Sequence, residues 1–126
     1  MTVFEAEIKG HVAGDDLEVR RTVTAIPSGQ TLTNADFVVQ NQDGTTFLTK
    51  SITASNQSGI GQIEDDGTTD QIGEIRFDLT SANTLLFQDE IVRHYQIRVK
   101  SSADKFYTVE EGLIKFVGSV VTPAIG

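Results

Sequence analysis

Residues 74–79 read Glu74-Ile-Arg-Phe-Asp-Leu79 and alternate strictly between polar and apolar side chains. Successive side chains of a β-strand point to opposite faces, so Ile75, Phe77 and Leu79 share one face and the charged residues share the other. A strand with this pattern has one face on the core and the other in water. The stretch therefore predicts a strand of an antiparallel sheet.

The same alternation recurs on both sides of this stretch. The inward positions that it predicts are Leu17, Val19, Val23 and Ala25 (interrupted by Arg21), Phe37 and Val39, and Tyr95, Ile97 and Val99. Further strands are expected within residues 3–9, 45–54 and 105–117. About seven strands separated by turns predict an all-β fold, an antiparallel β-sandwich of immunoglobulin type.

The last of these strands contains a break in phase. Tyr107 and Val109 are odd-numbered, whereas Ile114 and Phe116 are even-numbered, so a strict period of two cannot bury both pairs. One extra residue restores the phase, and glycine is common at such bulges. We therefore expect a β-bulge or a bend near Glu111-Gly112.

Turn residues separate the strands. Asp43-Gly44 predicts a hairpin, Ala103-Asp104 predicts a second one, and Pro27 is expected at the second position of a turn. Residues 55–73 are polar and glycine-rich, and they predict a long connection with one short edge strand. Its expected anchors are Ile60, Ile63 and Ile72. After it, Thr80 or Ser81 is expected to cap a single helical turn.

Length and charge limit the classes of function. The 126 residues fit one domain, 1–126, and the absence of cysteine excludes disulfides, thiolate metal sites and cysteine nucleophiles. A net charge of −8 disfavours binding to nucleic acid or to an anionic membrane surface. The start of the chain has no signal-peptide pattern, and its apolar runs are too short for a membrane helix. We therefore expect no nucleic acid and no membrane among its partners.

Two groups of residues are candidate chemical sites. His94 is expected on the outward phase of a strand, where a catalytic triad would need a serine and an acid to converge on it. The densest acidic cluster is Glu64, Asp65, Asp66 and Asp70, whose spacing does not match an EF-hand. A surface histidine and a solvated acidic loop are the favoured interpretations, so no catalytic residue, metal ligand or cofactor is assigned.

Apolar residues expected at the surface exceed what a small core needs. They occur in Val3-Phe4 near the start, in Leu85-Leu86-Phe87, in Phe116-Val117 and in an expected docking tail at residues 118–126. Such terminal arms either cover an edge of the core or dock on a neighbour, and both alternatives stay open. The expected partner-binding residues are Val3, Phe4, Val120, Val121 and Ile125.

Four motifs follow one another in the C-terminal half: Gly73-Glu-Ile-Arg-Phe-Asp-Leu-Thr80, Ser81-Ala-Asn-Thr-Leu-Leu-Phe87, His94-Tyr-Gln-Ile-Arg-Val-Lys100 and Lys105-Phe-Tyr-Thr-Val-Glu-Glu-Gly112-Leu-Ile-Lys-Phe116. Over residues 31–117 this order resembles the small immunoglobulin-like domains of tailed-phage structural proteins, such as the N-terminal domain of upper baseplate proteins. The connection at 55–73 departs from that pattern. The resemblance implies that Tyr95, Ile97, Val99 and Gly112 are fold residues, and it carries over no catalytic residue.

The resemblance and the apolar ends lead us to expect a non-enzymatic virion structural protein, a capsid decoration or a tail/baseplate adaptor subunit. It would be made in the host cytoplasm, bind other virion proteins and form a homo-oligomer. One alternative is a free-standing carbohydrate- or protein-binding β-sandwich module, although the absence of tryptophan weakens a sugar-binding site. Another is a small hydrolase built around His94 and the acidic residues.

Overall fold

A computed structural model describes residues 5–118 of the chain, with side chains from residue 7 onward. Within that range the chain forms eight strands and one short helix: β1 (Glu5–Ile8), β2 (Leu17–Val23), β3 (Leu32–Gln40), β4 (Thr46–Ile52), β5 (Gly61–Asp66), β6 (Gly73–Leu79), α1 (Ser81–Leu85), β7 (Arg93–Ser101) and β8 (Phe106–Ile114). The all-β class predicted from the alternation is confirmed, with eight strands where about seven were expected.

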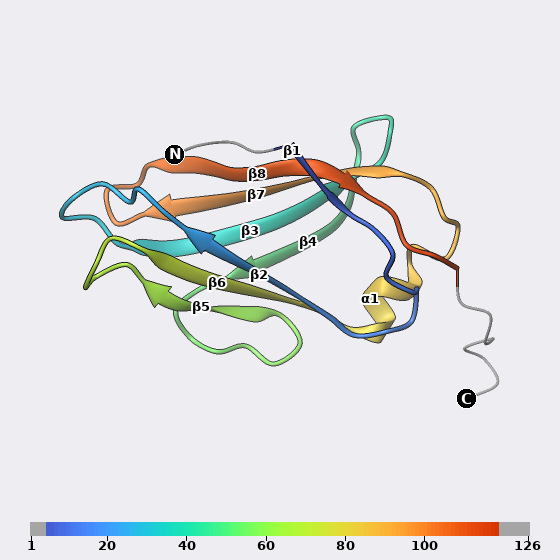
Figure 1. Cartoon of the computed structure of the whole chain (residues 1–126), viewed down its shortest axis with the longest axis horizontal. Coiled ribbons are helices and arrows are strands. Elements are labelled where there is room, and N and C mark those ends of the chain that lie inside the picture. The colour runs from blue at the N-terminus through green and yellow to red at the C-terminus, as the bar shows by residue number, and fades with distance from the viewer. Residues whose placement is uncertain (1–4, 119–126) are drawn as a thin grey trace.

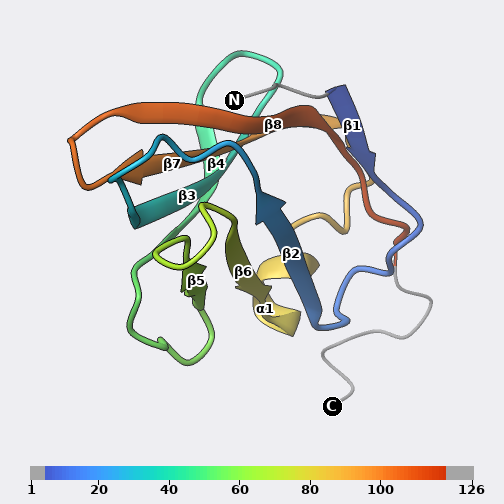
Figure 2. The same cartoon turned by 60° about the vertical axis from the view of Figure 1, so that its left-hand side comes forward.

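The strands form two facing sheets (Figures 1 and 2). One has five strands in the order β1-β8-β7-β3-β4, and the other has three in the order β2-β6-β5. This strand order matches that of an immunoglobulin-like sandwich. In that comparison β2, β6 and β5 correspond to strands B, E and D, and β8, β7, β3 and β4 correspond to strands G, F, C and C′. The predicted antiparallel sandwich is confirmed, with one parallel pair at an edge, where β1 runs parallel to β8. Parallel neighbours need a long connection, which the first and last strands have.

The core lies between the sheets and is built on the predicted inward faces. Ile75, Phe77 and Leu79 on β6 are buried, as are Tyr95, Ile97 and Val99 on β7. Phe37 on β3 joins the two layers: its ring centroid lies 5.6 Å from that of Phe77 and 5.6 Å from that of Tyr95. Such aromatic pairs add about 1 kcal/mol each beyond the burial of their area.

The connection after β2 differs from the expectation. Ala25 was expected on the inward face, but β2 ends at Val23 and Ala25 is exposed with a φ of +58°. Ile26 is buried in its place. The backbone reverses direction at this point, so the period of two no longer applies. Pro27 occupies the first position of the following turn, where the second was expected, because the Gln30 amide donates to the Pro27 carbonyl at 3.1 Å.

The predicted bulge is confirmed, and it lies at Val109. Ile97 pairs with Glu110, and the next residue of β7, Arg98, pairs with Thr108, which leaves Val109 as the extra residue. The expected place near Glu111-Gly112 was therefore slightly too late in the sequence. Because of the bulge, Val109 and Glu110 are both buried although they are neighbours in sequence. A carboxylate is thereby turned toward the interior of the sandwich.

The connections confirm most of the turn assignments. Asp43-Gly44 closes the β3–β4 hairpin, Asp104 closes the β7–β8 hairpin, and Thr80 caps α1 with its side chain. Within residues 55–73 the expected edge strand is β5. Ile63 is buried as predicted, whereas Ile72 is exposed and does not act as an anchor.

Candidate functional site

The residues predicted to bind partners cannot all be placed. Val3, Phe4, Val120, Val121 and Ile125 lie outside the described residues, as does most of the expected docking tail.

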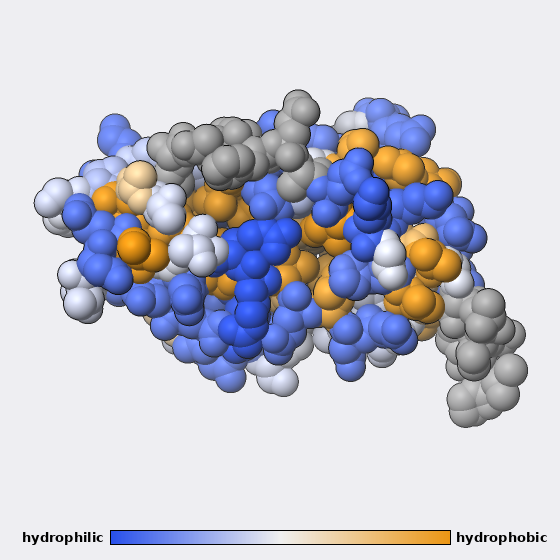
Figure 3. Space-filling model, viewed as in Figure 1, coloured by the Kyte–Doolittle hydropathy of each residue, from blue (hydrophilic) through white to orange (hydrophobic). Residues whose placement is uncertain are grey.

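The other apolar candidates divide into core and surface. Phe87 and Phe116 are buried with ring centroids 4.6 Å apart, so they belong to the core and were wrongly counted as surface residues. Leu86 and Val117 are about half exposed, and Val117 forms a parallel bridge with Val12, which is exposed too. Figure 3 shows apolar surface at this end of the molecule, which carries α1.

The outer face of the five-stranded sheet carries apolar side chains where a solvent-facing sheet is normally polar. Phe106 and Leu113 on β8 are 54% and 49% exposed. They pair with Lys100 and His94 of β7, which point to the same outer face. Val38 on β3 is half-buried on this face, level with Gln96.

A shallow hollow of about 280 Å³ lies on this outer face. Its lining residues are Val38, Gln40, His94, Gln96, Arg98 and Glu111. The Gln96 amide donates to Glu111 Oε1 at 2.9 Å, while Arg98 lies 4.5 Å above the Phe106 ring and 3.9 Å from Asp36 Oδ2. His94 is exposed at the rim, and its ring makes no hydrogen bond to the residues described. The hollow thus combines one apolar side chain, Val38, with the cation of Arg98 and the carboxylate of Glu111.

The outer face of the three-stranded sheet has the opposite character. Arg20 contacts Glu18 at 3.0 Å and pairs with Glu64, while Arg76 lies 3.4 Å from Glu64 and 3.0 Å from Asp78. Carboxylates and guanidinium groups therefore alternate along β2 and β6, where Arg20 stands opposite Arg76, and Glu64 of β5 contacts both arginines. Figure 3 shows a strongly hydrophilic band over β2. These charges are engaged with one another within the sheet.

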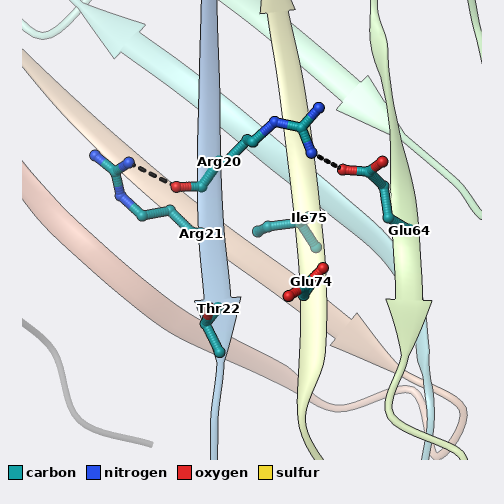
Figure 4. A pocket seen from close by; sticks show the side chains of 6 residues that line it. All are labelled: Arg20, Arg21, Thr22, Glu64, Glu74 and Ile75. Atoms are coloured by element: carbon teal, nitrogen blue, oxygen red, sulfur yellow. Dashed lines mark hydrogen bonds and ion pairs between the residues drawn. The ribbon is translucent and has the colours of Figure 1, made fainter.

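A second hollow, of about 220 Å³, lies beside this charged network (Figure 4). Arg20 points across β6 to Glu64, whereas Arg21 turns the other way and donates from Nη1 to the Arg20 carbonyl at 2.8 Å. Thr22, Glu74 and Ile75 complete the lining. Since both guanidinium groups are already paired, this hollow has no free cation to hold an anionic ligand.

Arg21 also connects the two sheets. Its Nε lies 2.8 Å from Glu110 Oε1 and its Nη2 lies 3.0 Å from Glu110 Oε2, while Tyr95 donates its hydroxyl to the same carboxylate. Burial favours the neutral carboxyl of Glu110, but the hydrogen bonds from Arg21 and Tyr95 outweigh it and lower its pKa. Burial, and then the bond to Glu110, raises the pKa of Tyr95. This buried cluster satisfies its own charges and holds the sheets together.

The acidic cluster serves the turns around β5. Backbone amides of Gly67, Thr68 and Ile72 donate to Oδ1 of Asp65, Asp66 and Asp70 at 2.9, 3.0 and 3.1 Å. Glu64 points to the arginines of the charged network instead. Across residues 5–118, histidine and acidic side chains do not gather in any group of three that could hold a metal ion.

Sequence reasoning missed the outward positions of Phe106 and Leu113. The signal was present in the phase break, because a bulge at Val109 sends even-numbered residues outward before it and odd-numbered residues outward after it. Arg21 was noticed only as an interruption of an apolar face, and its partner Glu110 was not identified.

Comparison with other proteins adds no relative. No protein-family model matches the chain, and a search of curated proteins finds no match either. In the described part of the chain, no helix has the length and hydropathy needed to cross a membrane.

Proposed function

We propose that the chain is a non-enzymatic virion structural protein, a capsid decoration or a tail/baseplate adaptor subunit of a tailed phage. The proposal combines two lines of support. The strand motifs within residues 31–117 resemble the immunoglobulin-like domains of phage structural proteins, and they lie in a sandwich of that type. The chain would act by protein–protein assembly in the virion, after synthesis in the host cytoplasm.

The observation that carries the proposal is apolar surface on an otherwise regular sandwich. Phe106 and Leu113 occupy outward positions of a well-paired strand, and Leu86 and Val117 are exposed at the α1 end. Exposed apolar groups on a small domain mark surfaces that partners cover. Other virion proteins and further copies of the same chain are the partners that the proposal names.

The polar clusters support an architectural role. An enzyme site needs a nucleophile, a base and a stabilising donor around one space. Here Arg21, Glu110 and Tyr95 bond to one another between the sheets, and Arg20 and Arg76 bond to carboxylates on the surface. Each of these groups therefore contributes to the rigidity of the sandwich.

Quantitative mass spectrometry of purified particles tests the proposal. Particles of the phage that encodes the chain are purified by density gradient, and a non-structural phage protein made at the same time serves as the control for carry-over. We expect the chain at a fixed copy number per particle and the control at trace level. A chain that is abundant in the lysate and absent from washed particles would refute the virion role.

A further inference from the structure

We propose that two copies of the chain pack through the outer faces of their five-stranded sheets, about a twofold axis that runs across the strands. The inference deepens the proposed function and rests on it for its biological setting. It names the surface used for self-assembly and the partner that covers it, a second copy of the same chain.

The apolar residues of β8 are placed for such symmetry. Along β7, the outward residues Lys100, Arg98, Gln96 and His94 define four successive rows, and their partners on β8 are Phe106, Thr108, Glu111 and Leu113. A twofold axis midway between the second and third rows lays β8 antiparallel over β8 of the second copy. Phe106 of each copy then faces Leu113 of the other, so two exposed apolar residues cover each other twice.

The same axis pairs opposite charges. It places Arg98 of one copy over Gln96 of the other, beside Glu111 and above the hollow of about 280 Å³. Arg98 is accessible for this contact, because its side chain is 46% exposed and its contacts within the chain are an ion pair of 3.9 Å with Asp36 and the Phe106 ring at 4.5 Å. Symmetry repeats the Arg98–Glu111 pair, as expected of an isologous interface.

The outer face of the five-stranded sheet carries little of the net charge, so two copies can approach each other through it. Two chains of net charge −8 repel each other, but much of that charge belongs to the other sheet. Residues 15–23 and 61–79, which form the three-stranded sheet with adjoining turns, hold nine acidic side chains and three arginines. Among the side chains that the structure describes, the outward charged residues on the strands of the five-stranded sheet are Glu7, Asp36, Arg98, Lys100 and Glu111. Three acids and two bases leave these residues with a net charge of −1.

The area of the face suits a stable dimer. The five strands β1, β8, β7, β3 and β4 hold 4, 9, 9, 9 and 7 residues. At about 3.4 Å per residue and about 4.8 Å between strands, their face measures about 600 Å². A standard protein interface buries about 800 Å² per partner. Sheets also pack face to face in this manner inside sandwich domains.

Cysteine cross-linking tests the geometry, because the natural chain has no cysteine. We expect a thiol-reactive cross-linker with a spacer of about 8 Å to join Phe106→Cys of one copy to Leu113→Cys of the other, because facing sheets lie about 10 Å apart, beyond the reach of a direct disulfide. Mass spectrometry of the linked peptides identifies the dimer. Each variant alone should cross-link poorly, since the symmetry separates like positions by three rows. The matched control is Thr22→Cys mixed with Gln62→Cys, on the outward side of the three-stranded sheet.

A charge exchange tests the interface without relying on cysteine. Light scattering and sedimentation of the full chain should show a dimer whose dissociation constant rises at least about 10-fold with Arg98→Glu or Glu111→Arg. The double variant R98E/E111R should restore it to within about threefold, and unchanged circular dichroism spectra of all the variants show that they fold.

Two outcomes overturn the inference: a chain that stays monomeric and uncross-linked at millimolar concentration, or a dimer that is indifferent to both single variants. A monomeric chain that is nevertheless found in purified particles would overturn this interface and leave the virion role standing. A dimer that obeys the charge exchange but is absent from particles would support the interface and refute the virion role.

Discussion

Arg21 of β2 and Glu110 of β8 form a two-pronged ion pair that spans the gap between the sheets, with N–O distances of 2.8 and 3.0 Å. Glu110 is buried because the bulge at Val109 turns it inward, and its relative exposure is only 8%. Arg21 also donates a hydrogen bond to the Arg20 carbonyl of β2, which is the edge strand of its sheet. The bulge at Val109 therefore places Glu110 where it can link β8 of one sheet to β2 of the other.

Breaking this pair should destabilise the fold strongly. Arg21→Met leaves the Glu110 carboxylate buried without its cation, and we expect a loss of about 3 kcal/mol in the free energy of unfolding. Arg20→Met removes an exposed ion pair one residue away and should cost below about 1 kcal/mol. Urea denaturation compares the two, and equal losses would show that Arg21 has no special role. Combining Arg21→Met with Glu110→Gln should recover part of the loss.

The Arg21–Glu110 pair also predicts how the stability of the fold depends on pH. The pKa of Glu110 is lowered in the folded state, so its contribution is present above the ordinary value near 4.5 and is lost as pH falls through the folded value. We expect the urea midpoint of the natural chain to fall more steeply between pH 5 and pH 3 than that of Glu110→Gln. Parallel curves for the two proteins would contradict this assignment.

Gly61 should be far less replaceable than Gly44. A Cβ at Gly61, where φ is +137°, would lie 2.0 Å from the Arg76 carbonyl oxygen, so Gly61→Ala must move β5 away from β6. We expect a loss of about 3 kcal/mol or more. At Gly44, φ is +89° and the Cβ would meet nothing within 4 Å, so Gly44→Ala should cost about 1 kcal/mol. Thermal unfolding of both variants measures the difference.

Thr84 should hold the connection between β1 and β2. It is fully buried in α1, accepts from the Gly14 amide at 2.9 Å and donates to the Asp15 carbonyl at 2.8 Å. Thr84→Val keeps the shape and leaves both backbone groups unpaired, so we expect a loss of about 2 kcal/mol. Thr49→Val at an exposed strand position should cost below about 0.5 kcal/mol. Faster amide exchange at Gly14 in the Thr84 variant would locate the effect.

Calcium should leave the melting temperature unchanged to within about 1 °C at millimolar concentration. One oxygen each of Asp65, Asp66 and Asp70 already accepts a backbone amide, and Glu64 is paired with arginine. A ligand that binds the folded state raises its stability, so scanning calorimetry with and without calcium is a direct check. A clear rise would show that the acidic turns form a cation site.

Local pattern was sufficient for much of the fold. The inward faces of β6 and β7, the Asp43-Gly44 hairpin and the Thr80 cap all depend on neighbouring residues, and all were predicted correctly. Errors occurred where the backbone leaves the regular strand conformation. Ala25 has a positive φ. After a residue with a positive φ, the alternation of side chains no longer predicts which side is buried.

Local alternation of side chains did not predict which strands pair with one another. Side-chain alternation and turn propensity act over a few residues, so they were sufficient to predict the strand class, most of the buried faces and the existence of a bulge. The contact of Arg21 with Glu110, 89 residues away, and the place of Phe106 and Leu113 on one outer face follow from how the strands pair and pack. Those relationships depend on strand order and on a one-residue shift in register, which long-range packing of the two sheets selects.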